Sequence, residues 1–333
     1  MKLKVTLFTI RAIIMIACVS FSAIAQDKPK ADAFYKIVAH DGSGDYTTIQ
    51  AAIDDSKSFP PQRITIFIKN GTYHEKVKVH EWNPDITLIG ESREGTVITY
   101  NDYFAKVNTG INSTFHTYTM LVEGDGFIAR DLTIVNASGD AGQAVALSVH
   151  ANNAIVVNCS ILGNQDTLYV SGNGFRIYFE NCLITGTTDF IFGSATAYFK
   201  SCTLHSLKNS YITAASTPQG EAYGFVFDDC RLTAERGIDA VYLGRPWRPY
   251  AKTVFINCMM DAHIKPEGWY NWNKQEAERT AFYAEYNCSG TGYKPSDRVK
   301  WSYQLTKRQA KAYTVENCLG VAMAARIKQL QLK

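Results

Sequence analysis

The sequence predicts an all-β protein whose short strands stack as the coils of a parallel β-helix, with short capping helices at the ends. Two observations predict this fold class: a strand phrase that recurs every 20 to 28 residues, and the lack of helical periodicity between its copies. Units of strand, helix and strand need about 30 or more residues and would not fit so short a period. With 46% hydrophobic residues among 333, the chain can fill one large domain, which we expect to span residues 26–333.

The recurring phrase is centred on one apolar anchor per coil. The anchors are Leu132, Cys159, Cys182, Cys202, Cys230 and Cys258. The residues three before and two after each anchor are apolar, and the residue just before it is always Asn, Asp or Ser. Side chains two apart share one face of a strand, so the three-residue step between apolar positions requires a bend. Asn, Asp and Ser favour such bends because they bond to nearby backbone.

Stacked coils place like residues on like, so we expect the cysteines to form a ladder of small buried side chains. Disulfide or metal roles are the alternative, but no pair of cysteines has C-x-x-C spacing. The chain has eight cysteines, of which Cys18 lies in a predicted leader. The odd number that remains argues against a fully paired disulfide framework.

Three segments are expected to close or cover the stack of coils. Thr47-Thr48-Ile49-Gln50 has the pattern of a capping box and opens a short amphipathic helix through Ile53. Residues 306–315 and 322–333 also permit helices, which we expect over the flank of the coils or at their far end. Uncovered edge strands would invite aggregation.

The first 25 residues have the pattern of a secretory signal peptide that is cleaved near Ala25. A lipoprotein signal acylated at Cys18 is the alternative, but the residues after it remain apolar. Cleavage would remove Lys2, Lys4 and Arg11 and no acid, so the formal net charge of +3 would fall to 0. We therefore expect an exported protein, periplasmic or extracellular, with no nucleic-acid partner and no membrane span.

Two acids, Asp166 and Asp189, each lie seven residues after the cysteine of their own coil. If the coils stack, the two carboxyl groups lie on neighbouring strands about 5 Å apart at the backbone. Two acids so close do not both ionise easily, so one gains a raised pKa while the other stays charged. Gln143 and Gln165 lie near them in register, and Arg245 is the best candidate to partner an acid. The spacing alone is equally compatible with two acids that merely cap backbone groups at turns.

Seven motifs follow one another between about residue 38 and about residue 316. They are Gly42-Ser43-Gly44-Asp45-Tyr46 with Thr48-Ile49-Gln50, Gly71-Thr72-Tyr73 with Glu75, Gln143-Ala144-Val145-Ala146-Leu147, Gln165-Asp166, Asp189 with its neighbours, Arg245-Pro246-Trp247, and Gly268-Trp269 with Trp272. In this order they make the chain strongly resemble the pectin methylesterase family, carbohydrate esterases on a right-handed parallel β-helix of the pectin lyase-like type. One stretch, residues 211–216, departs from the glutamine-glycine-arginine version that is more common in the family.

The resemblance implies a role for each of the five polar residues. Asp189 would attack the methyl ester carbonyl and form a covalent acyl-enzyme. Asp166 would protonate the departing methanol and then accept a proton from water. Gln143 and Gln165 would stabilise the oxyanion, and Arg245 would orient Asp189.

The resemblance also implies the substrate, methyl-esterified polygalacturonate, which would be converted to pectate and methanol by a monomer without metal or organic cofactor. Gln143 and Arg245 would contact the substrate too. The further substrate-binding candidates are Thr119, Tyr169, Phe190, Trp247 and Trp269. Three alternatives remain: an esterase or thioesterase of the same fold acting on another substrate, a pectin-cleaving β-helix, and a polysaccharide-binding protein without activity.

Overall fold

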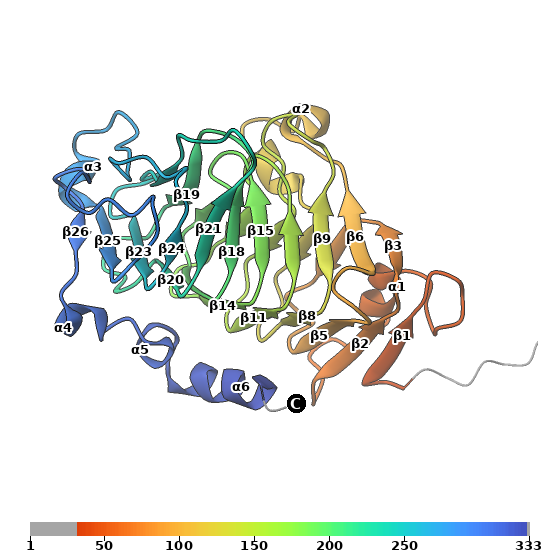
Figure 1. Cartoon of the computed structure of the whole chain (residues 1–333). Coiled ribbons are helices and arrows are strands. Elements are labelled where there is room, and N and C mark those ends of the chain that lie inside the picture. The colour runs from red at the N-terminus through yellow and green to blue at the C-terminus, as the bar shows by residue number, and fades with distance from the viewer. Residues whose placement is uncertain (1–31, 332–333) are drawn as a thin grey trace, which may run out of the picture. The chain divides into compact units, whose positions relative to one another are not determined.

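The computed structural model describes residues 32–331, which form three parallel β-sheets around one core (Figure 1). The predicted signal peptide, with Cys18, lies outside the described residues. Every strand pair in the three sheets is parallel, and the chain passes from the first sheet to the second and then the third in each full coil. The predicted parallel β-helix is confirmed.

The three sheets contain eleven, eight and seven strands. The first sheet contains β1 (Tyr35–Val38), β2 (Ile64–Ile68), β5 (Ile86–Gly90), β8 (Ile128–Arg130), β11 (Ala154–Val157), β14 (Arg176–Glu180), β17 (Thr196–Lys200), β20 (Phe225–Asp228), β23 (Lys252–Ile256), β25 (Phe282–Tyr286) and β26 (Tyr303–Gln304). The second contains β3 (Gly71–His74), β6 (Thr96–Tyr100), β9 (Thr133–Asn136), β12 (Ser160–Leu162), β15 (Leu183–Gly186), β18 (Thr203–Ser206), β21 (Arg231–Ala234) and β24 (Met259–Met260). The third contains β4 (Val77–Val79), β7 (Met120–Val122), β10 (Leu147–Val149), β13 (Leu168–Val170), β16 (Ile191–Gly193), β19 (Tyr211–Ala215) and β22 (Tyr242–Gly244).

The bend between the first and second sheets, which we call the ladder corner, lies at the polar residue before each anchor. These residues have left-handed backbone conformations, with φ between 50° and 58°: Asp131, Asn158, Asn181, Ser201, Asp229, Asn257 and Asn287. Asn and Asp tolerate this conformation better than other residues with side chains. Their side chains also bond from coil to coil: Asn181 Nδ2 donates to Asn158 Oδ1 at 3.0 Å, and Asn158 Nδ2 donates to Asp131 Oδ1 at 2.6 Å.

Like residues stack on like in the core. The rings of Phe179, Phe199, Phe227 and Phe255 lie in one column, with successive centroids 4.5 to 4.8 Å apart. Burial of each such ring contributes roughly 1.5–3 kcal/mol. The five anchor cysteines are buried and free, as predicted, and Cys288 extends the ladder by one further coil. The last cysteine, Cys318, is also buried and free, but in a C-terminal helix.

The N-terminal end of the stack is closed by α1 (Ile49–Asp54), close to the predicted helix. Its N-cap is Thr48, whose side chain accepts a hydrogen bond from the Ala51 N–H. The expected capping box is replaced by a longer-range contact, because the carboxylate of Glu75 accepts the N–H groups of Ile49 and Gln50 at 2.9 Å each. A carboxylate at a helix N-terminus is favourable for the helix dipole.

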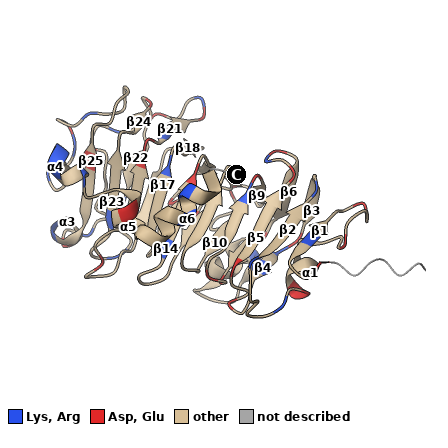
Figure 2. Ribbon diagram, turned by 90° about the horizontal axis from the view of Figure 1, so that it is seen from below, with Lys and Arg blue, Asp and Glu red and all other residues tan. Residues whose placement is uncertain are grey.

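Two C-terminal helices, α5 (Val315–Leu319) and α6 (Val321–Gln331), cover the outer face of the first sheet. They are preceded by α4 (Lys307–Ala310), which has no buried residue. Met323 and Ile327 of α6 bury apolar residues of this sheet, such as Ile128 and Ile155. Figure 2 shows that charged residues gather on loops and on these helices, whereas most strands carry few.

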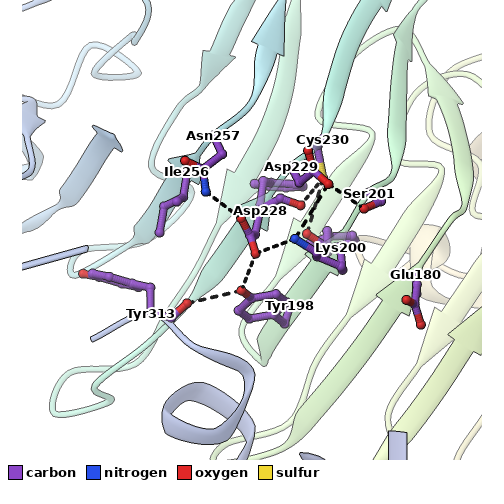
Figure 3. A network of polar contacts seen from close by, with 12 residues as sticks. Glu180, Tyr198, Lys200, Ser201, Asp228, Asp229, Cys230, Ile256, Asn257 and Tyr313 are labelled. Carbon is purple, nitrogen blue, oxygen red and sulfur yellow. Dashed lines mark hydrogen bonds and ion pairs between the residues drawn. The ribbon is translucent and has the colours of Figure 1, made fainter. Parts of the chain in front are cut away.

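A polar network fixes the C-terminal segment to the first sheet (Figure 3). The Tyr198 hydroxyl lies 3.0 Å from Asp228 Oδ2 and 3.2 Å from the carbonyl oxygen of Tyr313, just before α5. Lys200 Nζ donates to the same Asp228 oxygen at 2.9 Å. Burial raises the pKa of Tyr198 far above its ordinary value, so its hydroxyl keeps its proton. In residues 32–331, no helix is both long and apolar enough to cross a membrane.

Candidate active site

The two predicted acids lie at the opposite bend of the coil, between the second and third sheets, which we call the acid corner. Asp166 lies between β12 and β13, and Asp189 lies at the equivalent point of the next coil, between β15 and β16. Their backbones are left-handed, with φ of 64° and 47°. The Asp166 N–H donates to the Thr188 carbonyl at 3.0 Å, so the two acids lie on neighbouring strands in register. This placement agrees with the spacing of the anchors.

Arg245 follows β22 and forms a two-pronged ion pair with Asp189. Its Nε donates to Oδ1 at 2.9 Å, and its Nη2 donates to Oδ2 at 2.6 Å. The planar guanidinium lies between two aromatic rings, 3.9 Å from the centroid of Tyr211 and 3.6 Å from that of Trp272. A fork-shaped pair gives both energy and orientation, and the two rings hold the fork in its plane. The position of Asp189 is therefore set by three other side chains.

The two carboxyl groups have different electrostatic surroundings. Both are buried, with 4% and 6% of Asp166 and Asp189 exposed. Burial, and next the negative charge of Asp189, raise the pKa of Asp166 to about 8, against a smaller opposing effect of a hydrogen bond from Gln143. Burial also raises the pKa of Asp189, but Arg245 opposes this rise through a hydrogen bond and its charge. At neutral pH the pair therefore holds one proton, on Asp166, and one negative charge, on Asp189.

The two glutamines pair through their backbones as an isolated parallel bridge beside the acids. The Gln143 amide has both ends engaged: Nε2 donates to Asp166 Oδ2 at 3.0 Å, and Oε1 accepts from the Thr114 hydroxyl at 2.9 Å. The side chain of Gln165 has no hydrogen-bond partner among residues 32–331, although it lines the same cleft. Its amide N–H groups are therefore available to a ligand.

These residues line a cleft of about 870 Å³, counted with its open mouth. The lining includes the two aspartates, the two glutamines and Arg245. It also includes Trp247, whose ring centroid lies 5.8 Å from that of Phe192. The cleft therefore combines a polar floor with an aromatic wall, the composition that sites for sugar polymers and other ligands share.

Four of the predicted substrate contacts do not line this cleft. Phe190 and Trp269 are core residues, 0% and 1% exposed, and Trp269 packs against Tyr283 at a centroid distance of 4.4 Å. Thr119 is fully buried, and its hydroxyl donates to the Val135 carbonyl at 2.9 Å. Tyr169 is half-buried behind the cleft wall, with its ring 4.7 Å from that of Phe192. Trp247 alone among the predicted aromatics lines the cleft.

The structure places other residues in the cleft that the sequence interpretation did not single out as contacts: Thr114, Phe115, Phe192, Arg248 and Trp272. Strand alternation would have identified Phe192. In β16 the neighbours Ile191 and Phe192 point to opposite faces, and Ile191 belongs to the core. Phe115 lies in a short 3-10 helix (Ser113–His116) that is not part of the repeat. Within residues 32–331 there is no group of three or more His, Cys, Asp or Glu side chains arranged to hold a metal ion.

Comparison with known proteins places this geometry among related enzymes. The sequence profile of the family described as pectinesterase matches residues 35–322. Pectinesterase 31 of Arabidopsis thaliana is 39% identical over 281 residues, which cover 82% of this chain and 88% of that protein. The chain spans about half the length of several other curated plant relatives.

Solved structures of related enzymes share the fold, among them the following two. Pectin methylesterase from carrot has a TM-score of 0.82 and 33% identity, covering 88% of this chain and 95% of that chain. A pectin methylesterase in complex with hexasaccharide VII has a TM-score of 0.73 and 32% identity, covering 86% of this chain and 96% of that chain.

Proposed function

The chain belongs to the pectinesterase family, and from this premise we propose that its two buried aspartates hydrolyse the methyl esters of pectin through a covalent aspartyl intermediate. Pectinesterases are carboxylic ester hydrolases. The observation that carries the proposed mechanism is the unequal protonation of the pair: an ionised Asp189 held by Arg245, beside a protonated Asp166. A nucleophile and an acid are thereby ready in one cleft.

In the first half of the reaction, Asp189 attacks the ester carbonyl of a methyl galacturonate. The carbonyl π electrons move to the oxygen, and the amide N–H groups of Gln165, together with Gln143, stabilise that oxyanion. As the tetrahedral intermediate collapses, the bond to the methoxy group breaks and Asp166 gives its proton to form methanol. The substrate acyl group is left joined to Asp189 as an anhydride.

In the second half, water replaces methanol. Asp166, now ionised, takes a proton from the water as the water oxygen attacks the acyl carbon. The bond to Asp189 breaks, which releases a galacturonate carboxyl group and restores both aspartates to their starting protonation. Arg245 stabilises the Asp189 carboxylate as a leaving group, so one residue supports both halves of the reaction.

The substrate contacts and the location of the enzyme complete the proposal. Trp247 stacks on a sugar ring, and Gln143 and Arg245 contact the esterified unit. Thr119, Phe190 and Trp269 are removed from this role because their side chains are buried away from the cleft. We propose that the chain acts as a monomer. We place the enzyme outside the cytoplasm, after cleavage near Ala25, because residues 1–25 have the pattern of an export signal and the substrate is a polymer too large to enter the cell.

The test is methanol release from highly esterified pectin by residues 26–333. The wild-type protein is expected to release methanol without shortening the polymer, and Asp189→Ala to lose at least about 10⁴-fold of kcat. Asp229→Ala is the matched control, since Asp229 is also a left-handed aspartate, but at the ladder corner. It is expected to keep wild-type kcat. Persistent methanol release by a folded Asp189→Ala protein would reject the assignment of Asp189 as the nucleophile. Cleavage of the polymer by the wild-type protein in place of methanol release would reject the proposed esterase activity.

A further inference from the structure

A second hollow opens on the outer face of the first sheet, beside the segment that carries α4 and α5. Its volume is about 820 Å³, counted with its open mouth. Three tyrosines, two lysines and one acid contribute to its lining: Tyr198, Tyr286, Tyr313, Lys307, Lys311 and Asp228. The catalytic cleft lies at the acid corner, between the second and third sheets, and shares no lining residue with this outer hollow.

The floor of the outer hollow is the polar network of Figure 3. Asp228 is the one acid in its lining, and its Oδ2 accepts from Lys200 Nζ at 2.9 Å and from the Tyr198 hydroxyl at 3.0 Å. Its Oδ1 accepts from Asn257 Nδ2 at 3.2 Å. The negative charge of Asp228 is therefore neutralised within the floor and presents little repulsion to an anion in the hollow.

The rim of the outer hollow is positively charged. Lys307 and Lys311 are both exposed and lie four residues apart, so their side chains project from the same side of α4. A capping box between Thr306 and Gln309 fixes this helical turn. Neither lysine has an acidic partner within ion-pair distance among residues 32–331. Like charges at this spacing repel each other, and an anion between them would relieve the repulsion.

Two tyrosines provide the wall of the outer hollow. Tyr286 and Tyr313 are half-buried, and neither hydroxyl has a hydrogen-bond partner in the part of the chain that the structure describes. The Tyr313 ring is held by the edge of Tyr223, at a centroid distance of 5.6 Å. Burial raises the pKa of Tyr313 to about 12, so its hydroxyl remains a donor. A flat apolar ring with a free hydroxyl suits a sugar, which has an apolar face and a polar edge.

We propose that the outer hollow is a second carbohydrate site, which binds a stretch of free polygalacturonate away from the catalytic cleft. This inference rests on the proposed function, because that function makes polygalacturonate the polymer at hand. Carboxylates of the polymer would pair with Lys307 and Lys311, while its sugar rings pack against Tyr286 and Tyr313. A methyl-esterified stretch has no charge for the lysines, and a simple anion such as phosphate has no apolar face for the tyrosines.

The second site would keep the enzyme on polymer that has already reacted. Each turnover converts a neutral ester into a carboxylate, so the product is the form that the outer hollow binds. A chain held there raises the effective concentration of the remaining esters on the same polymer around the cleft. The gain appears in KM for long substrates and not in kcat, because the outer hollow contacts none of the reacting groups.

The experiment compares the double variant K307Q/K311Q with wild type on two substrates. One is a long homogalacturonan with about half of its units free, and the other is a fully methyl-esterified trimer, which has no free acid. For the long polymer, KM at low salt is expected to rise about tenfold in the variant while kcat stays unchanged, and for the trimer both constants should stay unchanged. Binding of long unesterified polygalacturonate, measured by calorimetry, should weaken about tenfold at low salt and less at high salt.

Arg308→Gln is the matched control, because Arg308 is an exposed cation of the same helix that does not line the outer hollow. It should change KM for the long polymer less than about twofold. Unchanged polygalacturonate binding in the double variant, or an equal loss in Arg308→Gln, would overturn the second site. Displacement of the polymer by inorganic phosphate at equal charge concentration would also overturn it, in favour of a simple anion site. Failure of wild type to release methanol from either substrate would instead reject the proposed function, while polygalacturonate binding would still decide on the second site.

Discussion

The ladder corner and the acid corner use the same backbone device for different ends. The ladder corner places Asn, Asp or Ser with positive φ at the bend of successive coils, and the acid corner places Asp with positive φ at the bend of two neighbouring coils. At the ladder corner, Asn181 donates to Asn158 and Asn158 donates to Asp131, so each side chain is bonded to the next coil. At the acid corner, Asp166 and Asp189 are stacked in the same way, but within residues 32–331 their side chains receive donors only from Gln143 and Arg245.

The difference lies in what satisfies the polar groups. A ladder of amides allows each side chain to donate to an oxygen of the next one, whereas carboxylates stacked directly on each other repel and must share a proton or recruit a cation. The ladder corner therefore stabilises the fold, and the acid corner is costly to the fold until Arg245 and one proton offset its charges. The acid corner can support catalysis because its carboxyl groups are not hydrogen-bonded to one another as the side chains of the ladder corner are.

The largest difference between the two corners is expected in catalysis, from Arg245→Gln at the acid corner. The change leaves Asp189 buried without a cation, so Asp189 takes up a proton or is displaced, and kcat/KM for methanol release should fall about 10³-fold. Arg245→Lys keeps the charge but loses the fork and the stacking between Tyr211 and Trp272, so a loss of about 10²-fold is expected.

The matched control is Arg298, a buried arginine that also forms a forked pair, with Glu285, at 2.8 and 3.0 Å and far from the acids in sequence. Arg298→Lys should lower the melting temperature and leave kcat of the folded protein close to wild type. Wild-type kcat/KM in Arg245→Lys would show that the geometry of the pair has no part in the reaction.

A second effect, about 3 kcal/mol, is expected in the pH dependence of stability. The pKa of Asp166 is about 8 in the folded chain, against an ordinary value of 3.8, so the folded state binds this proton more tightly. The contribution of this proton to the unfolding free energy is complete below pH 3.8 and is lost as the pH rises to about 8. Each pH unit is worth about 1.4 kcal/mol, so half of this window already amounts to about 3 kcal/mol.

Asp166→Asn removes the titrating group and tests that expectation. Urea unfolding between pH 5 and 9 should show a steeper decline of the unfolding free energy in wild type than in Asp166→Asn. Asp131→Asn, at the ladder corner, should leave the wild-type decline unchanged. In wild type, kcat/KM should also fall above about pH 8, as the general acid ionises. Parallel stability curves for wild type and Asp166→Asn would refute the raised pKa.

The comparison also explains what could be predicted from the sequence. The ladder corner was predictable because its Asn, Asp and Ser residues recur at one offset from an apolar anchor, and stacking follows from recurrence. The register of Asp166 and Asp189 followed from the same anchors. Cys288, preceded by left-handed Asn287, continues the pattern but was missed because the anchors used for the repeat ended at Cys258.

Residues that reach the cleft from outside the repeat could not be predicted in the same way. Phe115 lies in a short 3-10 helix (Ser113–His116) and Trp272 lies on a loop, and no periodicity fixes where side chains of such connecting segments point. Phe190 and Trp269 were expected in the cleft because their motifs resemble a family, but a motif does not say which face of a coil a ring occupies. Burial decides this, and it depends on the residues of neighbouring coils.

The smallest effect is expected at the ladder corner itself, where Asn181→Ala removes one side-chain hydrogen bond. The Asn181 side chain donates to Asn158, and φ is 52°. The backbone carbonyl of Asn181, which accepts from Arg93 at 3.4 Å, is kept in the variant. Alanine loses the side-chain bond and tolerates positive φ poorly, so the unfolding free energy should fall by about 1–2 kcal/mol. Asn181→Gly loses the same bond but adopts this φ freely, so its loss should be smaller. Both variants should release methanol at the wild-type rate well below their melting temperatures, because the ladder corner holds the coils together without taking part in the reaction. A reduced kcat in folded Asn181→Ala, measured beside its urea unfolding curve, would mean that the two corners are coupled through the coil.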